Sequence, residues 1–308
     1  MPSTHLIMEY MEHDLQTLLQ KRYRFNKDQV KSLMKQLLEG VNYLHSKDII
    51  HRDLKGGNLL LNNKGELKIA DFGLARVFHT ELKCLTKNVV TYWYRAPELF
   101  LNLDLYNEKI DMWSIGCIFS ELLTGQILFR GTEKTIDQMS KIYEKLGHPD
   151  AEWKEVVQLE LWEDLKPRKR YTNTLEQYHV ENCPFIDNDA IDLLQRLLKY
   201  NPRERLNAAE ALNHPYLQDA ATLKPYRLFE KLRNDGEEYH LVMQYKKQER
   251  QDKPPIYYNN RRNIPNDDKY HNNRSQELNK DEGLLKKREE STFSYAENLK
   301  PKRIVPKY

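Results

Sequence analysis

Hydrophobic side chains recur at helical spacing in several parts of the chain. Within residues 27–46, the apolar positions three and four residues apart are Val30, Leu33, Met34, Leu37, Leu38, Val41 and Leu44. This spacing puts them on one face and predicts an amphipathic helix. Residues 108–124 are apolar almost all round, which predicts a helix in the middle of a core. Further helices are expected at 14–22, with Asp14 as N-cap, and at 133–146, 187–199 and 207–213.

Shorter apolar runs predict a few strands beside these helices. Residues 5–11 are expected to form a short buried strand. Residues 59–61 and 67–70 are expected to form two strands joined by an Asn-Asn-Lys-Gly turn. Residues 49–58 are predicted to be a loop. Residues 71–98 show little periodicity, and an ordered loop of that length inside a domain is usually functional.

The composition changes after about residue 219. Residues 246–308 are rich in Lys, Arg, Asn, Gln and Glu and contain few aliphatic side chains. Such a segment buries too little apolar surface to offset its ordering entropy. We therefore expect a folded domain over 1–218 and a polar, largely disordered tail over 219–308. The whole chain has 49 basic and 46 acidic residues, which argues against a dedicated nucleic-acid-binding protein.

The cysteines and the lengths of the apolar runs indicate in which cellular compartment the protein is expected. Cys84, Cys117 and Cys183 are scattered and lack CxxC spacing, which favours reduced thiols inside a cell. No apolar run reaches the roughly 18 residues that a membrane helix needs, and acidic residues interrupt the apolar residues near the N-terminus. We expect a soluble, intracellular protein without a membrane partner.

The segments HRDLKGGN at 51–58 and DFG at 71–73 contain the groups that phosphoryl transfer needs. Asp53 is a candidate base or orienting group for an acceptor hydroxyl, and Lys55 can reach the transferred phosphoryl group. Asn58 offers an amide oxygen, and Asp71 a carboxylate, to a Mg²⁺ ion. An isolated loop aspartate would more often be an exposed surface residue. The ordered combination of these motifs favours an Mg-ATP site instead.

These residues resemble the signature of protein kinases, and further motifs extend the resemblance over residues 5–217. Ala96-Pro97-Glu98 resembles the end of the kinase activation segment, and Asp111, Trp113 and Gly116 fit the central helix. The resemblance implies an α+β protein kinase-like fold, with a mainly helical C-terminal lobe and small β-hairpins. It also implies a buried ion pair between Glu98 and Arg205.

Other segments narrow the resemblance to one subfamily. Lys55, two residues after Asp53, resembles Ser/Thr kinases rather than Tyr kinases. VVTYWYRAPE at 89–98 resembles cyclin-dependent kinases, in which the backbone near Val90 favours a proline after the phosphoacceptor. The Gly56-Gly57 pair and LIMEYMEHDL at 6–15 resemble the transcriptional branch of that family.

The resemblance also assigns a nucleotide pocket and a regulatory site. Adenine would contact Met8, Glu9 and Met11, the ribose would face Asp14, and Leu60 would lie under the base. Met8 and Leu60 could equally be plain core residues. Thr86 aligns with the activating phosphorylation site, with Arg52 and Arg76 as expected phosphate acceptors, although an unmodified loop threonine is the alternative. Thr91 resembles the threonine that bridges the catalytic Asp and Lys.

The sequence contains no glycine-rich loop and no VAIK-like lysine, which kinases place over the phosphates. We therefore expect an N-lobe-truncated kinase fragment with little activity of its own, and an apolar patch around Leu6, Met8 and Leu60. The intact enzyme would be a nuclear Ser/Thr kinase that uses ATP and Mg²⁺ and binds a cyclin and a protein substrate. The alternatives are a non-catalytic kinase-lobe scaffold or decoy, and a protein that binds through its basic tail.

Overall fold

The computed structural model describes residues 7–77, 92–103, 106–132 and 134–222. The helices are α1 Leu15–Gln20, α2 Lys27–Ser46, α3 Pro97–Phe100, α4 Lys109–Thr124, α5 Thr135–Leu146, α6 Trp162–Leu165, α7 Leu175–Asn182, α8 Asn188–Leu197 and α9 Ala208–Leu212. The strands are β1 His13–Asp14, β2 Ile49–Ile50, β3 Leu59–Leu61, β4 Leu67–Ile69 and β5 Arg76–Val77. No helix in the described part is long and apolar enough to cross a membrane.

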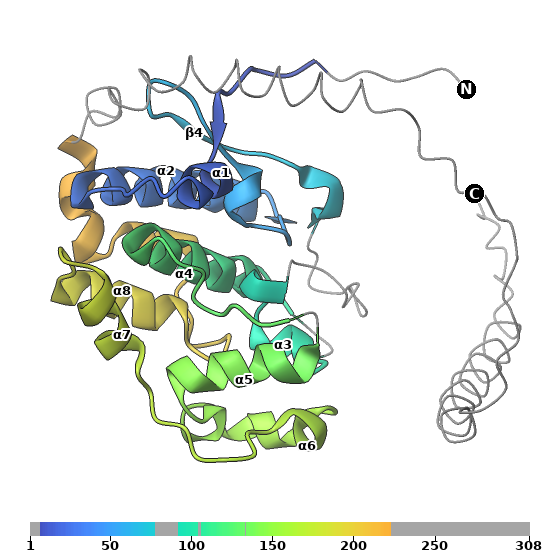
Figure 1. The fold of residues 1–308 in the computed structure, drawn as a ribbon. Coiled ribbons are helices and arrows are strands. Elements are labelled where there is room, and N and C mark those ends of the chain that lie inside the picture. Colours follow the sequence, from blue (N-terminus) through green and yellow to red (C-terminus); the bar gives the residue numbers. More distant parts are fainter. Residues whose placement is uncertain (1–6, 78–91, 104–105, 133, 223–308) are drawn as a thin grey trace, which may run out of the picture. The chain divides into compact units, whose positions relative to one another are not determined.

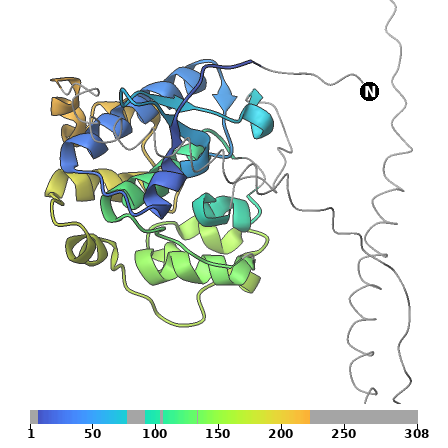
Figure 2. The same ribbon diagram turned by 45° about the horizontal axis from the view of Figure 1, so that its top comes forward.

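Helix α2 begins and ends where the apolar periodicity predicts. Asn26 caps its first turn by accepting from the backbone N–H of Gln29, whose side chain accepts in return from the N–H of Asn26. This reciprocal capping box satisfies two backbone donors that the first turn would leave unpaired. Helix α2 then packs against β4, α4 and α9, as its place between the small sheet and α4 in Figures 1 and 2 shows.

Helix α4 forms the centre of the core. Every residue from Ile110 to Thr124 is buried, as the all-round apolar pattern predicts. It contacts α2 on one side and α7 and α8 on the other, so it joins these helices into one core (Figure 1). Trp113 in α4 stacks on Phe129, with ring centroids 5.6 Å apart. This helix is the centre of the lobe, and the loop at 51–58 of the candidate site is attached to it.

Two small antiparallel sheets lie beside these helices. The hairpin of β3 and β4 matches the prediction, and β1 adds to its edge through the pairs His13–Leu61 and Asp14–Leu60. The predicted buried strand at 5–11 is wrong for its described part, since residues 7–11 form no strand and are largely exposed. The segment predicted as a loop at 49–58 contains β2, which pairs with β5.

Helices α3, α6 and α7 were not predicted. Two of them have only four residues, too short for a periodic pattern, and α7 buries only Leu175 and His179. The predicted disordered tail, apart from its first residues at 219–222, lies outside the described part of the chain.

Candidate functional site: the loops at 51–58 and 71–73

Hydrogen bonds hold residues 51–58, the predicted catalytic loop, to α4. The N–H of His51 donates to Oδ2 of Asp111 and the N–H of Arg52 donates to Oδ1, each over 2.9 Å. His45 at the end of α2 shares Oδ2 through its Nε2, also at 2.9 Å. Asp111 is buried, so its charge is stabilised by these donors rather than by water. One carboxylate therefore joins α2, α4 and the loop.

Asp53, Lys55 and Asn58 come together as the sequence predicts. The Nζ of Lys55 donates to Oδ2 of Asp53 over 2.7 Å. The side-chain amide of Asn58 donates to the same oxygen over 3.1 Å and to the Asp53 carbonyl over 2.8 Å. The Asp53 side chain is only 9% exposed, so the loop holds the carboxylate in one place. A carboxylate fixed beside an ammonium group can orient a hydroxyl near a phosphoryl group.

The second candidate ligand, Asp71, is tied to Asn58 through the hairpin. The N–H of Ala70 donates to the Asn58 carbonyl over 2.9 Å, which brings the end of β4 to the start of β3. Asp71 has a φ of 62°, and its carboxylate accepts from the N–H of Gly73 over 3.2 Å. This left-handed turn directs the chain sharply away from β4 and leaves Asp71 exposed.

Asn58 and Asp71 together suit a hard cation. Since the Asn58 Nδ2 donates to Asp53, its Oδ1 remains as the oxygen that can bind a metal. Mg²⁺ is usually held by one or two protein oxygens together with waters and substrate phosphates. Within the described residues no cluster of three His, Cys, Asp or Glu side chains forms a metal site. One amide oxygen and one carboxylate are donors of the kind that hold magnesium together with substrate phosphates.

The residues predicted around the nucleotide base are only partly assembled. Asp14 and Leu60 face each other in the β1–β3 pair, and Leu60 is half-buried. Asp14 also caps α1 by accepting from the Thr17 N–H over 2.8 Å. Glu9 is exposed, Met11 is half-buried, and Met8 is 71% exposed, so the core alternative for Met8 is wrong.

Exposed apolar side chains are present at this position. Ile7 and Tyr10 are exposed together with Met8, at 95%, 60% and 71%. Leu6, which the prediction included, lies outside the described residues, and Leu60 contributes only in part because it is half-buried.

The two arginines predicted to accept a phosphate differ in their surroundings. Arg52 is buried, and its Nε donates to the Leu74 carbonyl over 2.7 Å while NH1 donates to the Tyr106 hydroxyl over 2.8 Å. Arg76 is exposed in β5, opposite Ile50. Burial raises the pKa of Tyr106, although the Arg52 guanidinium opposes this shift. Thr86, Val90 and Thr91 lie outside the described residues.

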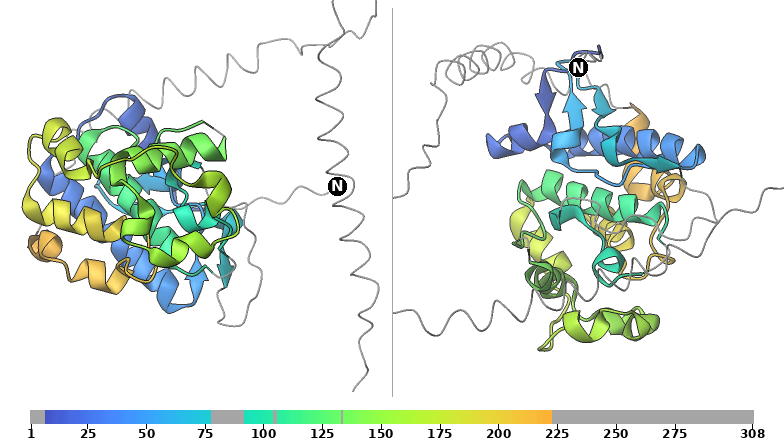
Figure 3. Two further views of the ribbon diagram at one scale, coloured as in Figure 1. Left: turned by 90° about the horizontal axis from the view of Figure 1, so that it is seen from below. Right: turned by 90° about the vertical axis from the view of Figure 1, so that its right-hand side faces the viewer.

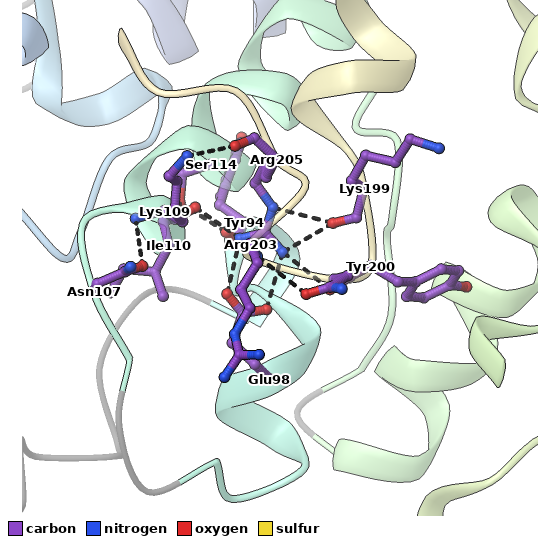
Figure 4. A network of polar contacts seen from close by, with 11 residues as sticks. Tyr94, Glu98, Asn107, Lys109, Ile110, Ser114, Lys199, Tyr200, Arg203 and Arg205 are labelled. Atoms are coloured by element: carbon purple, nitrogen blue, oxygen red, sulfur yellow. Dashed lines mark hydrogen bonds and ion pairs between the residues drawn. The ribbon is translucent and has the colours of Figure 1, made fainter. Parts of the chain in front are cut away.

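Glu98 and Arg205 form a buried ion pair below the site. NH1 and NH2 of Arg205 donate to the two Glu98 oxygens over 2.8 and 3.1 Å, and both side chains are at most 1% exposed. Further donors of Arg205 reach the carbonyls of Lys199 and Lys109 (Figure 4). The pair joins α3, at the predicted end of the activation segment, to the loop before α9.

Sequence reasoning missed two contacts that hold the catalytic loop. His45 was predicted only as part of a helix, yet it binds Asp111. Gln16 in α1 lies against the glycine pair, because a Cβ on Gly57 would come within 2.8 Å of its Oε1. A Cβ on Gly56 would meet the backbone N of Gln16 at 3.1 Å. The glycine pair was itself the available signal, since it permits this close approach.

Comparison with known proteins agrees with this geometry. The protein kinase domain family matches residues 2–217. Cyclin-dependent kinase 11 of Dictyostelium discoideum is 44% identical over 219 residues, which cover 70% of this chain and 59% of that protein. Cyclin-dependent kinase 12 of Caenorhabditis elegans is 42% identical over 229 residues, covering 73% of this chain and 31% of that protein.

A solved structure also matches. The chain aligns with the crystal structure of the yeast RNA Pol II CTD kinase CTDK-1 complex at a TM-score of 0.64 and 35% identity, with 68% of each chain covered. The chain belongs to the protein kinase domain family. Its relatives within that family are Ser/Thr kinases of the cyclin-dependent type, which confirms the predicted family and fold class. It spans 59% and 31% of the length of the first two relatives.

Proposed function

We propose that this chain carries the catalytic loops of a Ser/Thr protein kinase, which transfers the γ-phosphoryl group of ATP to protein hydroxyls that precede proline. The observation that supports this most is the cluster in which Lys55 and Asn58 both donate to one carboxylate oxygen of Asp53. Asp71 follows Ala70, whose N–H donates to the Asn58 carbonyl. This combination supplies a base, a cation and two metal-binding oxygens within one surface.

Each residue then has a distinct role. Asp53 orients the acceptor hydroxyl and takes its proton, while Lys55 stabilises the negative charge on the phosphoryl oxygens. Asn58 and Asp71 would hold Mg²⁺, which neutralises phosphate charge when it is bound. The bonds from Asn58 to Asp53 keep the base and the metal-binding oxygen in a fixed relation.

The remaining roles follow the family relationship. Met8, Glu9, Met11, Asp14 and Leu60 would contact the nucleotide, Val90 would form the substrate-proline pocket, and Thr91 would bridge Asp53 and Lys55. Phosphorylation of Thr86 would bring a dianion to Arg52 and Arg76. The cyclin-dependent relatives and the solved CTD kinase complex support a cyclin partner, a protein substrate and a nuclear location.

The 308 residues contain no glycine-rich loop and no VAIK-like lysine. The phosphates of a nucleotide bound to this polypeptide alone would remain in water, where each electrostatic contribution is weaker. We therefore expect the isolated polypeptide to bind Mg-ATP weakly and to transfer little phosphate.

A chimera tests the proposed function. The small lobe of the Dictyostelium relative would be joined to residues 7–308, and transfer to a Thr-Pro peptide would be measured. We expect turnover that Asp53→Asn lowers by about 10²–10⁴-fold, the usual contribution of a general base. Asp189→Asn, an exposed aspartate of α8, is the matched control and should leave turnover unchanged.

The chimera must bind Mg-ATP for the result to count. A folded, nucleotide-binding chimera that transfers no phosphate, or one in which both aspartate variants are equally active, would refute the proposed function.

A further inference from the structure

A cluster of basic side chains lies on the loop that joins α6 to α7. We call residues 166–170 the basic loop; Lys166, Arg168, Lys169 and Arg170 in it are all exposed. The loop follows α6, at the end of the lobe opposite the β3–β4 sheet (Figures 1 and 3). A molecule bound here would leave the surface around Asp53 uncovered.

The basic loop is held at both ends by hydrogen bonds. The Tyr143 hydroxyl of α5 donates to the Leu165 carbonyl over 3.0 Å, just before the loop. The His148 Nε2 lies 3.0 Å from the Lys169 carbonyl, within the loop. Just after it, Asn173 forms a β-bridge with Leu146. A loop fixed in this way loses less conformational entropy when it binds a ligand.

The two arginines of this loop are not held in ion pairs by the described residues. Lys166 pairs with Glu163 over 2.6 Å, and Lys169 lies 4.9 Å from the centroid of the Tyr171 ring. Among the described residues, no carboxylate forms an ion pair with Arg168 or Arg170. Two exposed guanidinium groups, with an ammonium group between them in the sequence, therefore remain available to an anion.

We propose that the basic loop binds a phosphorylated serine or threonine of a protein segment. Arginine forks match phosphate oxygens in a bidentate way, and a phosphomonoester brings a charge of about −1.5 to −2 to one point. A nucleic acid needs an extended positive surface instead. Here exposed carboxylates at Glu163, Asp164 and Asp150 flank the cluster and would repel a long polyanion.

The choice of ligand rests on the proposed kinase function, because a phosphorylated protein is the product of that reaction. A segment that stays bound to the basic loop through one phosphate would raise the effective concentration of its other hydroxyls near Asp53. The loop would then favour repeated phosphorylation of one chain over single events on many chains.

The binding itself can be tested on the 308-residue chain without any turnover. Fluorescence anisotropy would compare a labelled Ser-Pro peptide bearing one phosphate with the same peptide unphosphorylated. We expect the phosphopeptide to bind more tightly, and the double variant Arg168→Gln/Arg170→Gln to weaken it by at least about tenfold, as expected when charged hydrogen bonds are lost. Arg203→Gln, an exposed arginine outside the loop, is the matched control and should have no effect.

Three results would overturn the proposal. The two peptides could bind with equal affinity, or the double variant could bind the phosphopeptide as tightly as the wild type. An oligoribonucleotide could also bind more tightly than the phosphopeptide and lose affinity in the double variant. The last result would assign the loop to nucleic acid. None of these results depends on phosphoryl transfer, so a failure here would leave the proposed kinase function standing, and a failure of the chimera would leave this binding measurable.

Discussion

The catalytic loop at 51–58 and the segment at 7–11 differ in the contacts that hold them in place. Below the catalytic loop, Asp111 binds two loop N–H groups, and Glu98 and Arg205 are at most 1% exposed. At residues 7–11 the chain makes no strand pairs, and its charged contact from Glu9 to Lys68 is 3.5 Å long and exposed. Asp53 and Asn58 are therefore held together by buried hydrogen bonds, whereas the residues predicted to contact adenine have little support from the described residues.

The residues that we propose for phosphoryl transfer and those that we propose for adenine binding therefore lie in parts of the chain with different structural support. A change beneath the loop should cost folding free energy, because a buried charge loses its partner. A change at residues 7–11 should alter the unfolding free energy very little, because these side chains are exposed and water takes the place of the atoms that are removed.

The largest effect is expected at the buried ion pair. Glu98→Ala would leave the Arg205 guanidinium buried without its carboxylate, which typically destabilises a protein by about 3–5 kcal/mol. Urea unfolding followed by circular dichroism measures this change. Glu9→Ala, which breaks the exposed pair with Lys68, is the control and should cost no more than about 0.5 kcal/mol. Similar losses in the two variants would contradict the comparison.

The next effect is expected at acid pH and arises from His179. The Nδ1–H of His179 donates to the Leu175 carbonyl over 2.7 Å, and its Nε2 lies 2.8 Å from the Ser120 hydroxyl, which can donate to it when the ring is neutral. Burial lowers the pKa of His179 from 6.5 to about 4. Between these two pH values the unfolded chain therefore binds a proton at His179 that the folded chain does not. The contribution of His179 to the unfolding free energy is fully present above pH 6.5 and is lost as the pH falls toward 4.

Linkage sets an upper limit of about 3 kcal/mol on that loss, which should level off below pH 4. Unfolding free energies measured from pH 7 to pH 4 for the wild type and for His179→Gln isolate this contribution. The variant should be less stable at neutral pH and less sensitive to acid. Parallel pH profiles would show that His179 does not titrate in this way.

A smaller effect is expected where α4 meets α8. A Cβ on Gly116 would lie 2.7 Å from Cδ2 of Leu198 and 3.1 Å from the Leu197 Cβ. Gly116→Ala should therefore destabilise by about 1–3 kcal/mol through overpacking, in part offset by the helix preference of alanine. The double variant with Leu198→Ala should cost less than the two single changes added together. Additive losses would rule out the steric explanation.

The smallest effect on stability is expected at residues 7–11. Met8→Ser and Tyr10→Ser remove exposed apolar side chains, so the unfolding free energy should change by no more than about 0.5 kcal/mol. The same variants should bind less of a hydrophobic dye, because fewer apolar side chains are then exposed. A loss of stability comparable to that of Glu98→Ala would show that this segment is packed after all.

Local signals explain which parts could be predicted from the sequence. Helix α2 was predicted over its full length because one apolar face defines its period, while the capping pair at its start became visible only in the structure. Asp53, Lys55 and Asn58 lie within six residues, so a single loop brings them together. The strand at 5–11 was wrong because an apolar run does not specify a partner strand, and the pairing occurs at His13 and Asp14 instead.

Contacts between distant residues could not be predicted in the same way. His45 and Asp111 are 66 positions apart, and only the packing of α2 against α4 brings them to 2.9 Å. The ion pair of Glu98 with Arg205 was expected from the kinase resemblance alone, since neither residue carries a periodic signal. The basic loop was visible as a run of charge, but its exposure and its fixed ends required the structure.

The bonds from His51 and Arg52 to Asp111 have a consequence for hydrogen exchange. Both N–H groups are buried on a carboxylate that belongs to another element, so local fraying of the loop does not expose them. Solvent can reach them only when α4 separates from the loop, which is an opening of the core itself. Their amide protons should be among the slowest to exchange, and their rates would report the global stability of the lobe from within its candidate active site.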